Sequence, residues 1–519
     1  MSKSKVVIMI AMIVALGGLL MGFDASVISG VVRFIEPEFN LTKLELGWSV
    51  SSLTFTATLA MMLAGPLSDR FGRRLVLRYA AVLYVVSAIA SALAPTFWYL
   101  VVARMIGGFG VGASLILAPM YIAEIAPAKM RGRMVSFNQL NIVIGISLAF
   151  FTNYLILKYS SSDASWAKSL MLDTYQWRWM LGLETLPAVL YFIGLFFVPR
   201  SPRWLIMKGE IDQARDIMRK FSSEEQMEVD IAAIQQSMNS ESAKQKPSLS
   251  ELLNPTLRFV LIIGVVVAVL QQITGINSVF FYAPMIFEQS GIGTDASFIQ
   301  AILVGLVNLV FAILALVFID RLGRKPLLAY GVGGIVLCMF TLAYGFSSAT
   351  YSLSKDSIDM IVDTQSQQRL STLIGKTYQD DTAFKNALTK SLGAEKANEY
   401  KSVLIPAAIK MNSSLILFGI LGFVASFAIS IGPVMWVLFS ELFPNWIRGL
   451  AISFVGLINS AVSFIVQLVF PWELEVLGSA TTFLIYGMFA LLGLLFIIKK
   501  VPETKGKSLE ELEKMLVSK

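Results

Sequence analysis

Residues 65–74 read GPLSDRFGRR, and residues 320–325 repeat the end of this motif as DRLGRK. Each copy is a short, arginine-rich break between two long apolar stretches. A helix needs about 20 mostly apolar residues to cross a bilayer, and the stretches on both sides of each copy have that length. The same turn between two membrane-spanning helices is therefore predicted twice in one chain.

Apolar stretches of this length recur along the whole chain of 519 residues. The hydrophobic fraction is 56%, the mean hydropathy is +0.70, and only 15% of the residues are charged, whereas soluble proteins carry about 25%. We therefore predict an all-α integral membrane protein with twelve transmembrane helices. The twelve predicted spans are 6–30, 46–68, 77–95, 98–122, 135–157, 178–198, 257–285, 296–319, 327–347, 412–438, 449–471 and 480–499.

A second pair of motifs indicates that the chain consists of two halves. Glu124 and Arg131 stand seven residues apart in the first half, and Glu441 and Arg448 have the same spacing in the second. Parallel repeats of this kind are a known transporter architecture. The predicted divisions are an N-terminal six-helix half, a cytoplasmic linker, a C-terminal six-helix half and a cytoplasmic tail, over residues 1–198, 199–256, 257–500 and 501–519.

The repeat also locates an insertion. Asp320 lies 251 residues after Asp69, whereas Glu441 lies 317 residues after Glu124, so the second half holds 66 additional residues between its motifs. The polar stretch at 348–411, between the ninth and tenth spans, has that size. We interpret it as a small external cap or a semi-ordered loop, which either gates the transport path or is a solvated insert without a transport role.

The positive charges predict the orientation. Lysines and arginines outnumber acidic residues by 42 to 35, and they gather in the loops on the same side as both termini. Such loops face the cytoplasm. We therefore predict a multi-pass protein of the cell (inner) membrane with both termini in the cytoplasm, and no nucleic-acid partner. The linker run 209–221 places its apolar residues on one helical face, which predicts a cytoplasmic amphipathic helix.

The composition disfavours an enzyme. The chain has no histidine and only one cysteine, Cys338, so no metal site is predicted, and no cofactor. Residues 506–508 read GKS, but the upstream glycine that a phosphate-binding loop requires is replaced by Val501. The sequence therefore predicts neither an active site nor ATP-driven pumping.

Further motifs stand in order along the chain and join those already described: GFDASVISG at 22–30, RMIGGFGVG at 104–112, PRSPRW at 199–204, QQITGIN at 271–277, GPVMW at 432–436 and PETKG at 502–506. With them the chain resembles the sugar porter family of the major facilitator superfamily, with most likeness to bacterial proton-coupled pentose and hexose symporters. The resemblance covers nearly the whole chain, except the insert and the loop 158–175. It implies the major facilitator fold and a monomer that imports a monosaccharide by proton symport through alternating access.

Three charged residues lie inside the predicted spans: Asp24, Arg104 and Glu184. A charge at the bilayer centre costs about 2.5–3.5 kcal/mol on insertion scales, so each of these residues is expected to have a charged partner or a function. A carboxylate near a fixed cation ionises easily and takes up a proton when it is moved away, which suits proton coupling; a structural ion pair is the alternative. The resemblance implies coupling, because facilitators of the family have Asn at the position of Asp24. Glu184 either tunes Arg104, carries a proton itself or is structural.

Side-chain amides suit a sugar because they both donate and accept hydrogen bonds. Span seven holds three amides within seven residues, more than helix–helix contacts require, and Gly275 allows that helix to be irregular. Trp436, after the Gly432–Pro433 break, and Asn459, in span eleven, are assigned to the site because of the resemblance to the family. The predicted substrate-binding residues are Gln271, Gln272, Asn277, Tyr282, Trp436 and Asn459.

Three positions depart from the family pattern. Ile146 stands where the family has Gln, and Ser460 where it has Trp, so one hydrogen bond and one aromatic wall are missing. Arg200 replaces the glutamate of the motif after span six. The first two departures leave the identity of the sugar open, and the third affects how the two halves latch.

We interpret the charged cytoplasmic motifs as a latch that holds the outward-open form and releases in the inward-open form, the alternative being an orientation signal alone. Orientation needs no acidic partner, so the repeated Glu–Arg spacing favours the latch. The predicted gate residues are Arg70, Arg74, Glu124, Arg131, Arg321, Arg324, Glu441 and Arg448.

Other functions compete with symport. A proton-independent facilitator, a sugar sensor, a polyol transporter and an exporter of drugs or anions would share this architecture. The short tail argues against a sensor, and the amides of span seven favour a neutral substrate. The predicted partners are therefore a monosaccharide, the proton and the lipid bilayer.

Overall fold

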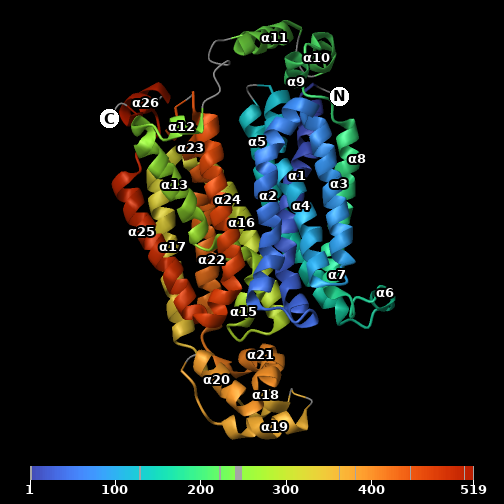
Figure 1. Ribbon diagram of the computed structural model, residues 1–519, viewed down its shortest axis with the longest axis vertical. Helices are drawn as coiled ribbons and strands as arrows, with labels where there is room; N and C mark the ends of the chain where they lie inside the picture. The colour runs from blue at the N-terminus through green and yellow to red at the C-terminus, as the bar shows by residue number, and fades with distance from the viewer. Residues whose placement is uncertain are drawn as a thin grey trace.

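The computed structural model describes residues 3–127, 130–220, 224–239, 248–359, 361, 363–379, 381–444, 446–507 and 509–517. Within these residues, twelve helices are long and apolar enough to cross a membrane. The prediction of an all-α protein with twelve spans is confirmed. Both termini lie at one end of the bundle, which we call the terminal face, and the insert lies at the other, the insert face (Figure 1).

The first half holds six spans, of which the sixth is broken into two helices. A Thr42 capping box starts the second span, and a Thr96 side chain caps the fourth. The helices are α1 (Lys3–Glu38), α2 (Lys43–Phe71), α3 (Arg73–Ala92), α4 (Phe97–Ile125), α5 (Arg131–Ser160), the short α6 (Ser165–Ser169), and α7 (Gln176–Gly182) with α8 (Thr185–Phe197).

The second half repeats this arrangement with breaks in its first and fourth spans. Its helices are the 3₁₀ turn η2 (Pro255–Leu257), α13 (Arg258–Ile273), α14 (Ile276–Phe281), α15 (Ala283–Glu288), α16 (Thr294–Leu322), α17 (Arg324–Ser347), α22 (Ser413–Ile429), α23 (Ile431–Leu442), α24 (Arg448–Val476), α25 (Gly478–Lys500) and the terminal α26 (Leu509–Val517).

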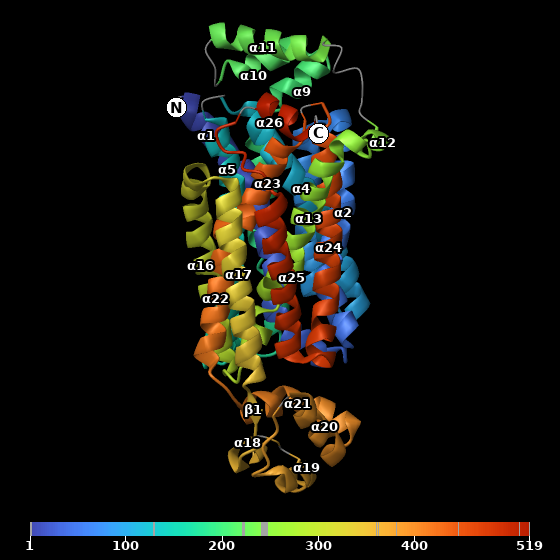
Figure 2. The same cartoon turned by 90° about the vertical axis from the view of Figure 1, so that its left-hand side faces the viewer.

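Four short helices connect the halves at the terminal face (Figures 1 and 2). Three of them bury apolar side chains, among them Ala214, Met218 and Met227, against the core of the first half, whereas the fourth buries Leu252 against the main core of the second half. They are α9 (Pro202–Met207), α10 (Ile211–Met218), α11 (Glu224–Asn239) and α12 (Leu249–Leu252).

The insert is a separate small helical unit beyond the membrane-spanning helices (Figure 2). It has its own apolar core around Phe384, Leu370 and Leu404. A two-stranded antiparallel ribbon, β1 (Thr350–Tyr351) with β2 (Ile409–Lys410), closes its base. Its helical elements are α18 (Lys355–Asp359), α19 (Thr364–Leu370), η3 (Ser371–Leu373), α20 (Asp381–Leu392) and α21 (Ala394–Ala408).

The glycines of RMIGGFGVG let α4 lie directly against α2. A Cβ atom at Gly108 would overlap Thr56, and one at Gly112 would overlap the Ala57 carbonyl oxygen. Any larger residue at either position would push the two helices apart. This close packing fixes the part of α4 that carries Arg104.

The two halves pack against each other towards the insert face. Apolar residues of the first half near that face, such as Val31 and Val50, join the main core of the second half, whereas those near the terminal face, such as Val14 and Leu77, form a separate core. A Cβ atom at Gly47 would overlap the Leu468 carbonyl oxygen, so α2 and α24 touch backbone to backbone there. The halves are therefore closed against each other on the insert side.

Candidate functional site

An ion pair lies buried in the middle of the first half. Asp24 of α1 and Arg104 of α4 are 2% and 1% exposed, and the carboxylate lies 3.3 Å from the guanidinium. Arg104 also donates to the Asp24 carbonyl oxygen at 3.4 Å. Two residues 80 positions apart in the chain thus form an ion pair that is shielded from solvent. The strength of their attraction therefore depends strongly on the distance between them.

A second buried carboxyl group belongs to the same cluster. Glu184 is 2% exposed and lies at the break between α7 and α8. It interacts electrostatically with both Asp24 and Arg104. One oxygen of each carboxyl group has no hydrogen-bond partner among the described residues, nor does Nε of Arg104. One carboxyl group is therefore paired with the guanidinium and a second lies buried near it, with polar atoms of all three side chains left unpartnered among the described residues.

Gly107 makes room for this cluster. A Cβ atom at this position would lie 2.9 Å from a carboxylate oxygen of Asp24 and 2.5 Å from the Ser87 hydroxyl. The side chain of Asp24 can therefore reach Arg104, one turn away on α4, only because residue 107 has no side chain.

The predicted substrate amides form one hydrogen-bonded network in the second half. Asn459 donates to Gln271 at 2.8 Å, and Gln272 donates to Asn459 at 3.1 Å. Asn277, five residues along the chain from Gln272, donates to its side-chain oxygen at 2.8 Å. Four of the six predicted substrate residues thus lie in contact although they come from α13, α14 and α24.

Two further polar residues extend the network and were missed from the sequence. Ser463 accepts from Asn277 at 2.7 Å and from Gln467 at 2.8 Å. Together with Asn459, these residues stand four apart along α24, a spacing that places all three on one helical face. Gln467 then accepts from Thr54 of α2 at 2.9 Å, so the network crosses from one half to the other.

A left-handed glycine gives the network its shape. Gly275 has φ +86° and separates α13 from α14, which turns Asn277 towards Gln272. A Cβ atom there would overlap the Tyr486 ring, so only glycine fits. The fourth span of this half is broken at Ser430, and the Gln271 amide donates to the carbonyl oxygens of Ile431 and Gly432, in the first turn after the break, at 3.4 and 3.3 Å.

The remaining predicted pocket residues lie around this network. Tyr282 is buried and donates to the Gln467 carbonyl oxygen at 3.1 Å. Trp436 is 46% exposed, and its ring meets Phe439 edge-on. Ile146 and Ser460 are both partly buried. The tryptophan is therefore the one predicted substrate residue that does not join the hydrogen bonds.

At the terminal face of the first half, Glu124 pairs with Arg73. Nε of Arg73 lies 3.1 Å from Glu124, a second nitrogen lies 2.8 Å from Asp69, and Ser201 donates to Glu124. Arg73 was not among the predicted gate residues. The repeat could have identified it, because the offset of 251 residues between the two motifs aligns Arg73 with Arg324.

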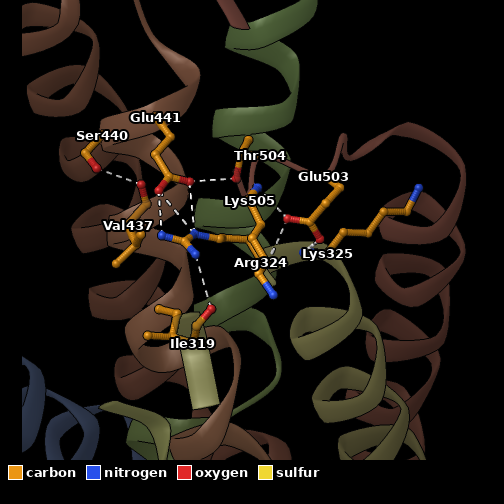
Figure 3. A network of polar contacts seen from close by, with 9 residues as sticks. All are labelled: Ile319, Arg324, Lys325, Val437, Ser440, Glu441, Glu503, Thr504 and Lys505. Atoms are coloured by element: carbon orange, nitrogen blue, oxygen red, sulfur yellow. Dashed lines mark hydrogen bonds and ion pairs between the residues drawn. The ribbon is translucent and has the colours of Figure 1, made fainter. Parts of the chain in front are cut away.

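The second half carries the matching arrangement, drawn in Figure 3. Arg324 lies 2.8 Å from Glu441, and Thr504 donates to the same carboxylate at 2.6 Å. Glu503 accepts from the backbone N–H groups of Arg324 and Lys325, both at 3.1 Å, and so caps the start of α17.

The other predicted gate residues for which contacts are described make them within their own halves. Arg74 and Arg448 donate to backbone carbonyl oxygens, and Arg70 lies over the Phe71 ring at 5.2 Å. The backbone of Arg321 accepts from Lys505, and the side chain of Arg131 lies outside the described residues. Between described side chains, no ion pair crosses from one half to the other at the terminal face.

An ion pair does cross between the halves near the insert face. Arg33 of α1 pairs with Glu288 of α15 and also donates to Thr294. Burial raises the pKa of the Glu288 carboxyl above its ordinary value, and the neighbouring Arg33 guanidinium opposes that shift. Trp48 of α2 packs edge-on against Phe464 of α24 at 5.5 Å on the same side. These contacts hold the insert side closed.

The family model described as "Sugar (and other) transporter" matches residues 10–363 and 397–516. This chain belongs to the sugar transporter family. The gap between the two matched ranges falls inside the insert, so the match covers all twelve membrane-spanning helices apart from the first residues of α1. A D-xylose-proton symporter of Escherichia coli (strain K12) is 35% identical over 98% of this transporter and 96% of its own length. An arabinose-proton symporter of Bacillus subtilis (strain 168) is 32% identical, with coverages of 98% and 95%.

Solved structures resemble this sugar transporter over nearly its full length. The inward-open conformation of the E. coli xylose transporter XylE matches with a TM-score of 0.75 and 33% identity, covering 98% of this chain and 100% of XylE. XylE bound to 6-bromo-6-deoxy-D-glucose matches with a TM-score of 0.70 and 34% identity, covering 99% and 100%.

Proposed function

We propose that this sugar transporter imports a monosaccharide, a pentose or a hexose, together with a proton. The observation that carries this proposal is the buried Asp24–Arg104 pair in one half beside a network of amides in the other. The symporters of xylose and arabinose among its relatives support the same assignment. The terminal face is then cytoplasmic, and so are both termini.

Asp24, Arg104 and Glu184 carry the proton in this proposal. With both carboxyl groups ionised, the cluster would hold one uncompensated negative charge, which is costly in a dry interior. A bound proton neutralises it. When rocking of the halves changes the distance between Asp24 and Arg104, the affinity for that proton changes, and proton movement becomes linked to the conformational cycle.

The amides of Gln271, Gln272, Asn277 and Asn459 bind the sugar hydroxyls, with Tyr282 behind them and Trp436 against the ring face. Each amide can donate and accept, so a sugar replaces hydrogen bonds that the amides otherwise make to one another. Because Gln467 links this network to Thr54 of the other half, sugar binding and the closure of the insert side act on the same hydrogen bonds.

The terminal-face clusters form the inner gate. Arg70, Arg74, Glu124 and Arg131 belong to it in the first half, with the newly identified Arg73. Their counterparts in the second half are Arg321, Arg324, Glu441 and Arg448. In the present structure the described pairs stay within each half, and in the outward-facing form we expect them to exchange partners across the interface.

The test is uptake of labelled monosaccharides into proteoliposomes, with and without an inward proton gradient, for the wild type and Asp24→Asn. We expect the wild type to accumulate one sugar against its gradient, and the variant to keep sugar exchange but lose accumulation. Equal, gradient-independent equilibration by both proteins would instead identify a facilitator. Accumulation by the variant at the wild-type level would refute the role of Asp24.

A further inference from the structure

A cavity of about 100 Å³ opens at the terminal face of the first half, outside the transport path. Arg74, Arg78 and Arg200 line it together with Gly72 and Trp204, whose ring packs against Gly72. This space corresponds to several water-sized groups, enough for a phosphate group. Arg73 and Arg74 of its lining also belong to the proposed inner gate, but the transport mechanism assigns no ligand to the cavity.

The second half shows what occupies the matching place there. Glu503 follows Pro502 and precedes Thr504, as Arg200 follows Pro199 and precedes Ser201. The equivalence is also structural, since Thr504 donates to Glu441 and Ser201 donates to Glu124. In the second half the Glu503 carboxylate binds the first N–H groups of α17. An anion thus sits at the start of one of the two equivalent helices.

In the first half this anion is missing and a cation stands in its place. No described side chain caps the N-terminus of α3, a helix of 20 residues that carries a partial positive charge at this end. Arg200 replaces the capping glutamate. The cavity therefore combines a helix start that lacks its carboxylate with an additional guanidinium.

The arginines around the cavity have little negative charge near them. Arg74 donates to the Val198 carbonyl oxygen, and Arg78 donates to that of Leu195 and stacks on Phe196 at 4.2 Å. The nearest carboxylate to Arg200 belongs to Glu210 at 3.8 Å, and both of these side chains are more than a third exposed. The carboxylates of Glu124 and Asp69 are already paired with Arg73.

We propose that this cavity binds a phosphate group, free or in a lipid headgroup, at the start of α3. The ligand would accept from the helix N-terminus and from Arg74 and Arg200, as Glu503 does from α17. It would tie α3 to the chain after span six, next to the Arg73–Glu124 pair, and so stabilise the first half from the terminal face. Phe71, which is exposed beside the cavity, brings the site to the edge of the lipid-facing surface.

The test measures thermal unfolding of the purified full-length protein in a neutral detergent at constant ionic strength. Inorganic phosphate, or mixed micelles with phosphatidylglycerol in place of phosphatidylcholine, should raise the melting temperature of the wild type, because a ligand that binds only the folded state stabilises it. A shift with inorganic phosphate identifies a free anion, and a shift with phosphatidylglycerol alone identifies a lipid headgroup.

Arg200→Glu gives the first half the carboxylate that Glu503 provides in the second half. This variant should abolish the shift without lowering the melting temperature of the unliganded protein. Arg200→Gln removes only the charge, and we expect it to weaken the apparent affinity about tenfold, as the loss of one charge-assisted hydrogen bond does. Arg219→Glu, the same charge change elsewhere in the linker, should respond as the wild type. A wild type that responds to neither ligand, or an undiminished shift in Arg200→Glu, would overturn the proposal. Because the readout is binding, it is independent of sugar transport.

Discussion

Ser463 joins two amides of the proposed sugar site, since its hydroxyl accepts from both Asn277 and Gln467. Its position beside the pocket, rather than any motif, gives it this role. A small hydroxyl between two amides can adjust when a sugar enters, because it donates as well as accepts. We therefore expect Ser463 to affect sugar affinity although it lies outside the predicted set.

Ser463→Ala should raise the KM for sugar about tenfold and leave the maximal rate nearly unchanged, because the partly buried Asn277 and the buried Gln467 lose an acceptor at a cost of about 1–3 kcal/mol. Uptake kinetics in proteoliposomes measure this. Ser453→Ala is the matched control, since Ser453 lies on the same helix, is exposed and bonds only to the Gly449 carbonyl oxygen. An unchanged KM in Ser463→Ala would remove this residue from the site.

For single residues, sequence reasoning identified the amides because an amide in a membrane span points to a specific chemistry. It missed partners whose residue types are common in such spans. Serine is common in membrane helices, so Ser463 stands out only after the four-residue spacing from Asn459 is noticed. Arg73 was missed beside the more exposed Arg74, although the internal repeat aligns it with Arg324. The Asp24–Arg104 pair, in contrast, could be predicted from the sequence, because a charged residue inside a membrane span needs a partner.

Among the helices, the broken spans determine where the polar groups meet. The sequence predicted the irregular span seven from Gly275 and the break near Gly432, because glycine and proline mark such positions. It did not predict the break in span six at Glu184, although the run LGLETLPA has Gly182 on one side of this residue and Pro187 on the other. Pro187 has no N–H group to donate to the Leu183 carbonyl oxygen, so this break also follows from local sequence preference.

Gly275→Ala should slow transport strongly while the protein still inserts and folds. Alanine at φ +86° costs about 1–2 kcal/mol, and its methyl group would overlap the Tyr486 ring. Turnover of labelled sugar exchange measures the effect. Gly293→Ala is the control, because that glycine has φ −58° and open space around it; equal turnover in the two variants would argue against a hinge at Gly275.

For the molecule as a whole, the conformational state is the property that sequence reasoning could not supply. The same residues must build both an outward-facing and an inward-facing form, so motifs and spans are compatible with either. The structure records the form that is closed on the insert side, where the Arg33–Glu288 pair joins α1 to α15. This pair was absent from the predicted gate, which considered only the cytoplasmic motifs.

Glu288→Gln should weaken this closure and expose the pocket to the outside. In a Cys338→Ser background, which leaves no native cysteine, Thr54→Cys provides a reporter at the interface between the halves. We expect faster labelling of this cysteine by an impermeant thiol reagent in Glu288→Gln. Asp163→Asn, which breaks an exposed ion pair with Lys168, should leave the rate unchanged. Identical rates in both variants would mean that the pair does not hold the gate.

Removing the insert should leave transport nearly intact. The Ser352 N–H donates to the Ala408 carbonyl oxygen at 2.9 Å, so a short glycine–serine linker can replace residues 353–407 without moving the ribbon β1–β2. Uptake within about twofold of the wild type is expected, since the insert has its own core. A large loss of turnover, with normal expression, would favour a gating role.

The amide network also has a kinetic consequence. The amides of Gln271, Gln272, Asn277 and Asn459 bond to one another and to neighbouring backbone, so they find hydrogen-bond partners within the protein itself. The unloaded carrier can therefore return across its cycle without first recruiting a replacement ligand. Net uptake requires this empty return in every turnover, whereas exchange of one sugar for another does not, so the two modes should run at comparable speeds.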